Sequence, residues 1–248
     1  MAKKLVVANW KMAPESLKEA QDLFRSYLDL ELKNVDLIVA PPFDYTEKLT
    51  EIPYKKSGIK FGAQDVFYEN PSGAYTGEIS AKMLKDADVK YVIVGHSERR
   101  RFLNESDQIV NKKMLASVKG GLVPVLCVGE NVSVRNKGRK TVENFIKSQL
   151  EKDLRGIGKT AKLIVAYEPV WAIGTGNEDA PQDALEIIIF IKKLLVKNHK
   201  LKAVKILYGG SVDSQNIGNF LQYKDIDGAL VGGSSVNKKE FAKLIKKI

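Results

Sequence analysis

Lys11, His96 and Glu168 each come directly after a short apolar run of this sequence. A carboxylate that loses hydration in apolar surroundings becomes a stronger base, so Glu168 is a candidate general base. A histidine can polarise a carbonyl group, and a lysine can neutralise an anion. Taken singly, each also has a structural interpretation, because Glu168 could pair with a cation, His96 could pack in a core and Lys11 could lie on a rim.

Two pairs of glycines also follow apolar runs, Gly209-Gly210 before Ser211 and Gly232-Gly233 before Ser234. Paired glycines let backbone N–H groups approach an anion closely, and the start of a following short helix would add its positive dipole end. One such pair is weak evidence for a phosphate site. Two of them, placed at equivalent points of the chain, favour a phosphate cradle.

The segment from Pro169 to Gly176 directly follows Glu168. It begins with proline, has a bulky apolar middle and ends in Gly-Thr-Gly. Apolar residues on a loop are unfavourable unless the loop closes onto something, so the pattern predicts a lid over the candidate base.

The elements that must position these groups are a recurring series of apolar, β-branched runs. Their near-continuous apolarity is typical of strands buried on both faces of a parallel sheet. The runs are Leu5 to Trp10, Val35 to Ala40, Ile59 to Ala63, Tyr91 to Gly95, Leu122 to Val128, Leu163 to Tyr167, Val204 to Tyr208 and Gly228 to Val231.

Amphipathic stretches alternate with these runs and predict helices over 16–30, 106–119 and 184–196. Asp213 and Asn237 are predicted to cap two further helices, the last two of the chain. Eight strand–helix units in 248 residues give a period of about 31 residues. The sequence therefore predicts an α/β fold, a single (β/α)8 barrel over residues 1–248. An open doubly wound sheet is the alternative, but it expects Gly-x-Gly-x-x-Gly after the first strand, where this chain has Asn9-Trp10-Lys11.

In a (β/α)8 barrel the active site forms where the carboxyl ends of the strands meet, and a phosphate commonly binds after strands seven and eight. The three candidate chemical groups and both glycine pairs should therefore converge. His96 and Cys127 lack partners at metal-ligand spacing, so we expect no metal.

The net charge of +10 has two interpretations, an anionic partner or a solvated surface. The lysines are scattered along helices without an aromatic and basic stripe, so we expect no nucleic-acid partner. No run is long enough to predict a membrane span. The single cysteine, Cys127, excludes an intrachain disulfide and favours a cytoplasmic setting.

Tracts along the whole chain resemble the triosephosphate isomerase family. The most specific are those at 95–100, 166–176 and 208–212, and the others are at 9–12, 40–43, 62–64, 73–78, 127–130 and 227–233. The resemblance implies interconversion of dihydroxyacetone phosphate and D-glyceraldehyde 3-phosphate, in glycolysis and gluconeogenesis, without a cofactor. In this family a carboxylate base, a neutral histidine and a closing lid have well-known roles.

The resemblance also implies roles for individual residues. Glu168 is the base, His96 polarises the carbonyl group, and Lys11 and Asn9 contact the substrate and stabilise the enediolate. Glu98 would pair with Lys11, and Ile173 and Leu230 would cover Glu168 when the lid closes. The phosphate would be held by Gly174, Ser211, Gly232 and Gly233.

The same resemblance implies a homodimer formed through the loop 67–78, with Thr76 close to the partner's active site. The chain departs from the family at Asn177-Glu178-Asp179, the far hinge of the lid, and at Ala13. A nucleic-acid-binding barrel, an inactive structural relative and a different phosphate-binding barrel enzyme remain as alternatives.

Overall fold

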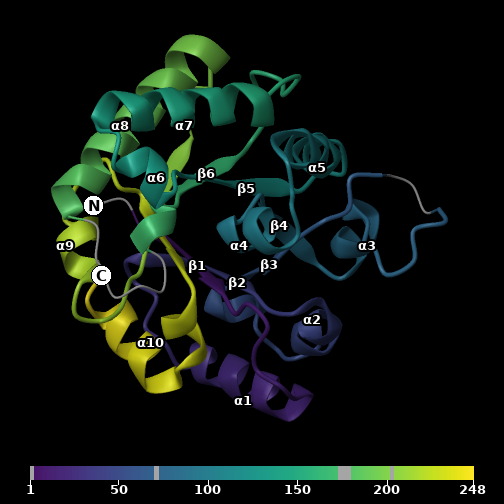
Figure 1. Ribbon diagram of the computed structural model, residues 1–248. Coiled ribbons are helices and arrows are strands. Elements are labelled where there is room, and N and C mark those ends of the chain that lie inside the picture. Colours follow the sequence, from purple (N-terminus) through teal and green to yellow (C-terminus); the bar gives the residue numbers. More distant parts are fainter. Residues whose placement is uncertain (1–2, 70–72, 173–179, 202–203) are drawn as a thin grey trace.

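A computed structural model describes residues 3–69, 73–172, 180–201 and 204–248 of the chain. Its centre is a closed barrel of parallel strands in the order β1 to β8, and pairing of β8 with β1 closes it (Figure 1). The predicted barrel is therefore confirmed, and the alternative of an open doubly wound sheet is wrong. The strands are β1 (Lys4–Asn9), β2 (Val35–Ala40), β3 (Lys60–Ala63), β4 (Val89–Val94), β5 (Val123–Val128), β6 (Ile164–Tyr167), β7 (Lys205–Tyr208) and β8 (Gly228–Val231).

Every strand coincides with a predicted apolar run, with ends that shift by up to two residues. Strand β1 begins at Lys4 because its first residue pairs with Val35 of β2, and β4 begins at Val89, which pairs with Phe61 of β3. Neighbour pairing, which depends on the closed sheet, sets these ends more than side-chain polarity does.

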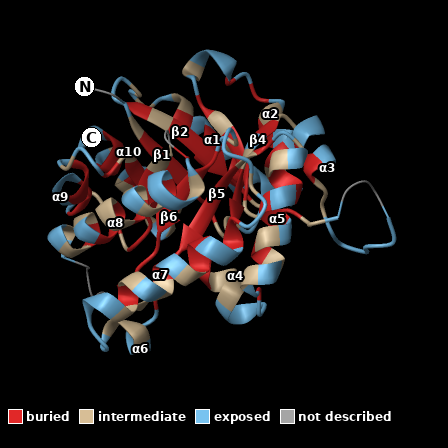
Figure 2. Cartoon of the chain, turned by 90° about the horizontal axis from the view of Figure 1, so that it is seen from above, coloured by how far each residue is buried: buried red, intermediate tan, exposed pale blue. Residues whose placement is uncertain are grey.

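The strands are buried on both faces, which explains why their sequences do not alternate between apolar and polar residues. One apolar cluster fills the barrel interior and includes Val7, Ile93 and Leu207. A second, larger cluster lies between the barrel and the helices and includes Phe24, Phe61 and Ile187. Figure 2 shows the strands as buried and the helices as buried along the sides that face them.

Helices surround the barrel on its outside (Figure 1). Within the described residues, none of them combines the length and the apolarity that crossing a membrane requires. The α-helices are α1 (Leu17–Leu28), α2 (Phe43–Thr50), α3 (Ala81–Asp86), α4 (Ser97–Phe102), α5 (Asp107–Lys119), α6 (Val132–Arg135), α7 (Arg139–Asp153), α8 (Pro181–His199), α9 (Ile217–Leu221) and α10 (Lys238–Lys246), and the 3-10 helices are η1 (Lys55–Ser57), η2 (Val170–Ala172) and η3 (Gly233–Val236).

Side-chain caps fix several helix starts where the sequence predicts them. Ser106 Oγ accepts a hydrogen bond from the Ile109 N–H of α5, and Asn237 Oδ1 accepts one from the Glu240 N–H of α10. The predicted cap at Asp213 is wrong in detail. Its carboxylate accepts from the N–H groups of two residues in the turn before α9, which begins four residues later, at Ile217.

Candidate active site

A cleft of about 560 Å³ opens at the carboxyl ends of the strands. It brings together residues that follow β1, β4, β7 and β8, as the barrel prediction requires. Among the predicted site residues, its lining contains Asn9, Lys11, His96, Ser211, Gly232 and Gly233. Gly174 lies outside the described residues, and Glu168 lies just beneath the cleft surface, with 2% of its area exposed.

Glu168 is held at the end of β6 by contacts to the end of the neighbouring β5 and to the turn that follows β4. Its N–H donates to Val128 O at 2.8 Å, and its Oε2 accepts from the N–H of Ser97 at 2.9 Å. Its Oε1 lies 3.1 Å from His96 Nε2, although the two atoms are not aligned as a hydrogen bond. The carboxylate is thus buried, and one oxygen has no hydrogen-bond partner in the described structure.

His96 precedes α4 and is fixed by the start of that helix. Its Nδ1 accepts from the N–H of Glu98 at 3.2 Å. A ring nitrogen that accepts a hydrogen bond carries no proton, so this geometry favours the tautomer with its proton on Nε2. The N–H at Nε2 is therefore the group that faces Glu168.

The turn that carries His96 is tied to the rest of the barrel by Arg100. The guanidinium donates through Nε to Gly95 O at 2.8 Å, through Nη1 to Asp107 at 2.7 Å and through Nη2 to Asp153 at 2.6 Å. Three bonds from one planar group hold the end of β4 against α5 and α7, which limits the movement of the imidazole.

Lys11 has a left-handed backbone, with a φ of 55°. Asn9 Oδ1 accepts from the Lys11 N–H at 3.0 Å, and Gln64 Nε2 donates to Lys11 O at 2.8 Å and to Ala40 O at 2.9 Å. The Lys11 ammonium forms an ion pair with Glu98, the partner that the resemblance implies. These contacts stabilise an unfavourable conformation that directs the ammonium into the cleft.

Gln64 is a positioning residue whose role was not predicted from the sequence. The signal that could have found it is the one used for the other groups, because Gln64 is a polar residue directly after the apolar β3. Ser97 is the second omission. It contributes through its backbone N–H, so its side-chain type carries no signal.

The glycines after β7 and β8 do more than expose backbone N–H groups. A Cβ at Gly209 would lie 2.9 Å from Glu168 Cγ, and a Cβ at Gly232 would lie 2.9 Å from Lys11 Cε. Both glycines thus leave room for the side chains that carry the chemistry. A short helix, η3, follows the second pair as predicted, but no helix directly follows the first, where the next one is α9.

The start of the predicted lid is described as far as Ala172. Glu130 accepts from Trp171 Nε1 at 2.9 Å and from the hydroxyl of Tyr167 at 3.1 Å, and burial raises the pKa of this carboxyl. Ser211 Oγ donates to Ala172 O at 2.8 Å and so joins the lid to the glycine cradle.

The rest of the lid, 173–179, lies outside the described residues, including Ile173 and the departure from the family at 177–179. Leu230, the other residue expected to cover Glu168, is buried and lines the cleft. Among the residues that are described, no three His, Cys, Asp or Glu side chains gather as a metal site requires.

The arrangement can move a proton on a small anionic carbonyl compound. A buried carboxylate can remove a proton next to a carbonyl group, while a neutral imidazole N–H and an ammonium stabilise the negative charge that develops on the oxygen. Two glycine-rich turns beside these groups can receive an anionic group.

Comparison with known proteins agrees with this chemistry. The family model described as triosephosphate isomerase matches residues 4–248. Proteins named triosephosphate isomerase are similar over 99% of this chain: that of Dictyoglomus thermophilum is 39% identical, that of Caldanaerobacter subterraneus subsp. tengcongensis 42% and that of Mycoplasma mobile 44%. The alignments cover 100%, 99% and 100% of those proteins, respectively.

Proposed function

Because this chain belongs to the triosephosphate isomerase family, we propose that it interconverts dihydroxyacetone phosphate and D-glyceraldehyde 3-phosphate. The observation that carries the proposal is the meeting of Glu168, the Nε2–H of His96 and the ammonium of Lys11 at one cleft. The reaction needs no cofactor, because the proton that leaves one carbon returns to its neighbour.

In the proposed mechanism, Glu168 removes a proton from the carbon next to the substrate carbonyl. The electron pair of the C–H bond forms the carbon–carbon double bond of an enediolate, and the carbonyl electrons move to oxygen. His96 Nε2–H and Lys11 stabilise this oxygen as its charge develops, with Asn9 beside them. The protonated Glu168 then returns the proton to the adjacent carbon, while the hydroxyl proton moves between the two oxygens.

The short distance between the side chains of Glu168 and His96 supports a movement of these side chains when the substrate binds. A substrate that reacts with both groups must lie between them, so the distance of 3.1 Å between Oε1 and Nε2 has to increase. Closure of the lid over the bound substrate would exclude water and strengthen each electrostatic contact.

The phosphate group is assigned to the side of the cleft formed by Ser211, Gly232 and Gly233, with Gly174 from the lid. The close approach of backbone at the glycine pair and the start of η3 support this assignment. Ser211 also contacts the lid at Ala172, so phosphate binding and lid closure would affect each other.

A coupled isomerase assay with glyceraldehyde 3-phosphate on the wild type and on Glu168→Gln tests the proposal. Gln keeps the size of the side chain but cannot accept the proton, so we expect kcat to fall roughly 10²- to 10⁴-fold while inorganic phosphate still inhibits at a similar concentration. A variant that turns over as fast as the wild type would show that another group is the base. Absence of turnover in the folded wild type would reject the activity itself.

We further propose a homodimer formed through the loop 67–78. Apolar side chains near this loop and the cleft are exposed: Met12 at 96%, Phe102 at 66% and Tyr75 at 44%. Exposed apolar groups that lie together mark protein contact surfaces. The described parts of the connection between β3 and α3, residues 64–69 and 73–80, extend away from the barrel at the right of Figures 1 and 2, where a partner could receive them.

We propose that the whole chain, 1–248, is one catalytic domain and acts in the cytoplasm. The family match over 4–248 supports the first part. The single cysteine, a buried free thiol, is consistent with a reducing compartment.

A further inference from the structure

A second cavity, of about 570 Å³, lies at the opposite end of the barrel from the cleft. It is formed where the strands begin and by the connections that lead into β6 and β7. The apolar cluster of the barrel interior separates it from the cleft. The strand residues that line it are Leu5, Asp36, Lys60, Tyr91, Val123, Ile164 and Lys205.

The floor of this N-terminal cavity is apolar. Leu5 and Ile164 belong to the barrel-interior cluster, and Val123 packs against the same cluster. Leu163 and Leu201 add buried apolar side chains from the two connections. Such a floor favours the apolar part of a ligand over water.

The rim of the cavity is strongly basic. Five lysines line it, Lys60, Lys159, Lys162, Lys200 and Lys205, and Asp36 is the one carboxylate among the described lining residues. Asp36 lies 3.9 Å from Lys205. Within the described part of the chain, the other four lysines form no ion pair with a carboxylate within 4 Å, so the rim carries an excess of positive charge.

Tyr91 adds a polar group to the wall. Its phenol is half-buried at the start of β4, and burial together with Asp36 raises its pKa. Like an ordinary tyrosine hydroxyl, it is protonated at neutral pH and can donate a hydrogen bond to an anionic oxygen.

An uncompensated group of cations above a low-dielectric surface repels itself and attracts an anion. The volume is that of a small-molecule site, which fits a compact ligand better than a polymer. We propose that the N-terminal cavity is a binding site for a phosphate monoester with an apolar, preferably aromatic, body. The phosphate lies among Lys60, Lys162 and Lys200, and the apolar body lies on Leu5, Val123 and Ile164. This site is independent of the isomerase chemistry proposed for the cleft.

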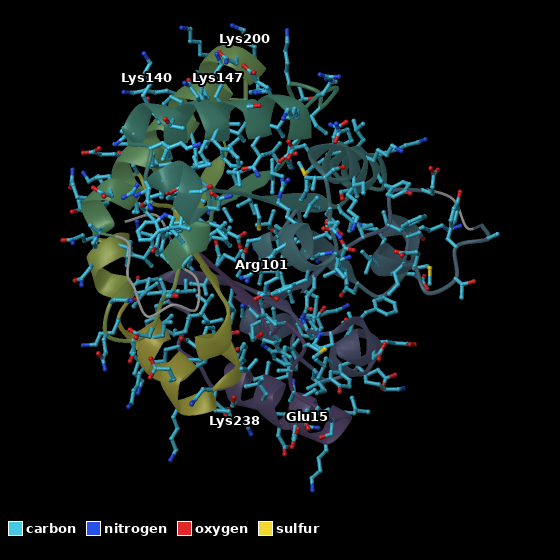
Figure 3. All side chains as sticks on the ribbon, viewed as in Figure 1. Glu15, Arg101, Lys140, Lys147, Lys200 and Lys238 are labelled. Carbon is cyan, nitrogen blue, oxygen red and sulfur yellow. The ribbon has the colours of Figure 1, made fainter. Side chains whose placement is uncertain are left out.

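Isothermal titration calorimetry with 1-naphthyl phosphate tests the site. The test protein is the double variant Lys162→Gln/Lys200→Asn. Both lysines are exposed in the wild type, so their replacement should not disturb the core. Asn is chosen at position 200 because it tolerates the left-handed backbone there, whose φ is 59°. The control is Lys18→Gln/Lys238→Gln, which removes the same charge from exposed positions on α1 and α10. Lys200 and Lys238 lie at opposite edges of the view in Figure 3.

With the cleft saturated by dihydroxyacetone phosphate, we expect one saturable site for 1-naphthyl phosphate in the wild type. Its Kd should be about tenfold higher in Lys162→Gln/Lys200→Asn and change less than twofold in the control, because two partly exposed ion pairs with the phosphate are lost only when the cavity lysines are replaced. Inorganic phosphate should bind at least tenfold more weakly than 1-naphthyl phosphate. Circular dichroism and isomerase turnover check that both variants are folded.

Four results would overturn the proposal. Absence of saturable binding would exclude the site, and equal weakening in both double variants would assign the binding to overall charge. Unchanged binding in both would place the ligand elsewhere, including the cleft. Equal affinity for inorganic phosphate would show that the apolar floor takes no part.

Discussion

At the scale of single residues, the active-site turn depends on a buried ion pair. Asp153 is fully buried and bonds Arg100, which holds the turn before His96, while its second oxygen has no hydrogen-bond partner in the described structure. Burial raises the pKa of Asp153 to about 7, although the guanidinium of Arg100 opposes the shift. Asp107 competes for the same guanidinium and adds to the increase.

This pKa predicts a pH dependence of stability. The folded-state pKa of Asp153 lies above the unfolded value of 3.8. The contribution of this group to the free energy of unfolding is therefore complete below about pH 4 and is lost as the pH rises towards 7. We expect the wild type to lose stability relative to Asp153→Asn between pH 5 and pH 8. Urea unfolding at pH 5 and pH 8 measures the difference in free energy of unfolding between the two proteins. If this difference is the same at both pH values, the shifted pKa is contradicted.

At the scale of elements, the ends of β6, β7 and β8 are packed so closely that glycine is required between functional groups. The Cβ that any other residue would place at Gly209 meets Glu168 Cγ at 2.9 Å and Tyr167 O at 3.2 Å. The first neighbour is the candidate base and the second is backbone of the strand that carries it, so neither can move without changing the geometry of the base.

Gly209→Ala should therefore lower kcat by about tenfold or more, because small displacements of a catalytic group have large effects on rate. The matched control is Gly218→Ala in α9, where an added Cβ has no neighbour within 4 Å. Alanine in a helix should leave turnover unchanged and raise stability by up to about 1 kcal/mol. Steady-state kinetics and thermal unfolding distinguish the two variants, and an active Gly209→Ala enzyme would show that Glu168 tolerates the shift.

At the scale of the whole molecule, the three most exposed large apolar side chains among the described residues, Met12, Phe102 and Leu103, lie beside the cleft. Met12 is adjacent to Lys11 in sequence, and Phe102 lines the same cleft. The loop 67–78 supplies Tyr75 and Thr76, both exposed. A partner subunit that covers Met12 would also restrict Lys11, so assembly and catalysis would be linked.

Thr76→Asp tests this link. A carboxylate buried in an interface without a partner is unfavourable, so we expect a monomer at micromolar concentration and a large decrease in kcat. Thr76→Ser should remain dimeric and active. Sedimentation velocity and the isomerase assay measure both effects, and a monomeric wild type, or a dimeric and active Thr76→Asp enzyme, would reject the proposed interface.

The order of eight apolar runs, the helices with their caps at Ser106 and Asn237, and the positions of Lys11, His96 and Glu168 after strands could be predicted from the sequence. These features depend on neighbours along the chain, and the barrel rule then places all strand ends together. Gln64, which was not among the predicted site residues, follows the same rule, because it is a polar residue directly after β3.

Only the tertiary structure decided which of these groups touch. The approach of His96 Nε2 to Glu168 and the close contact of Gly209 with Glu168 join residues that are distant in sequence. The basic N-terminal cavity likewise combines scattered lysines that the sequence presents as solvated surface. Hydrogen bonds and ion pairs act over a few ångströms, and closure of the barrel alone determines which side chains come within that distance.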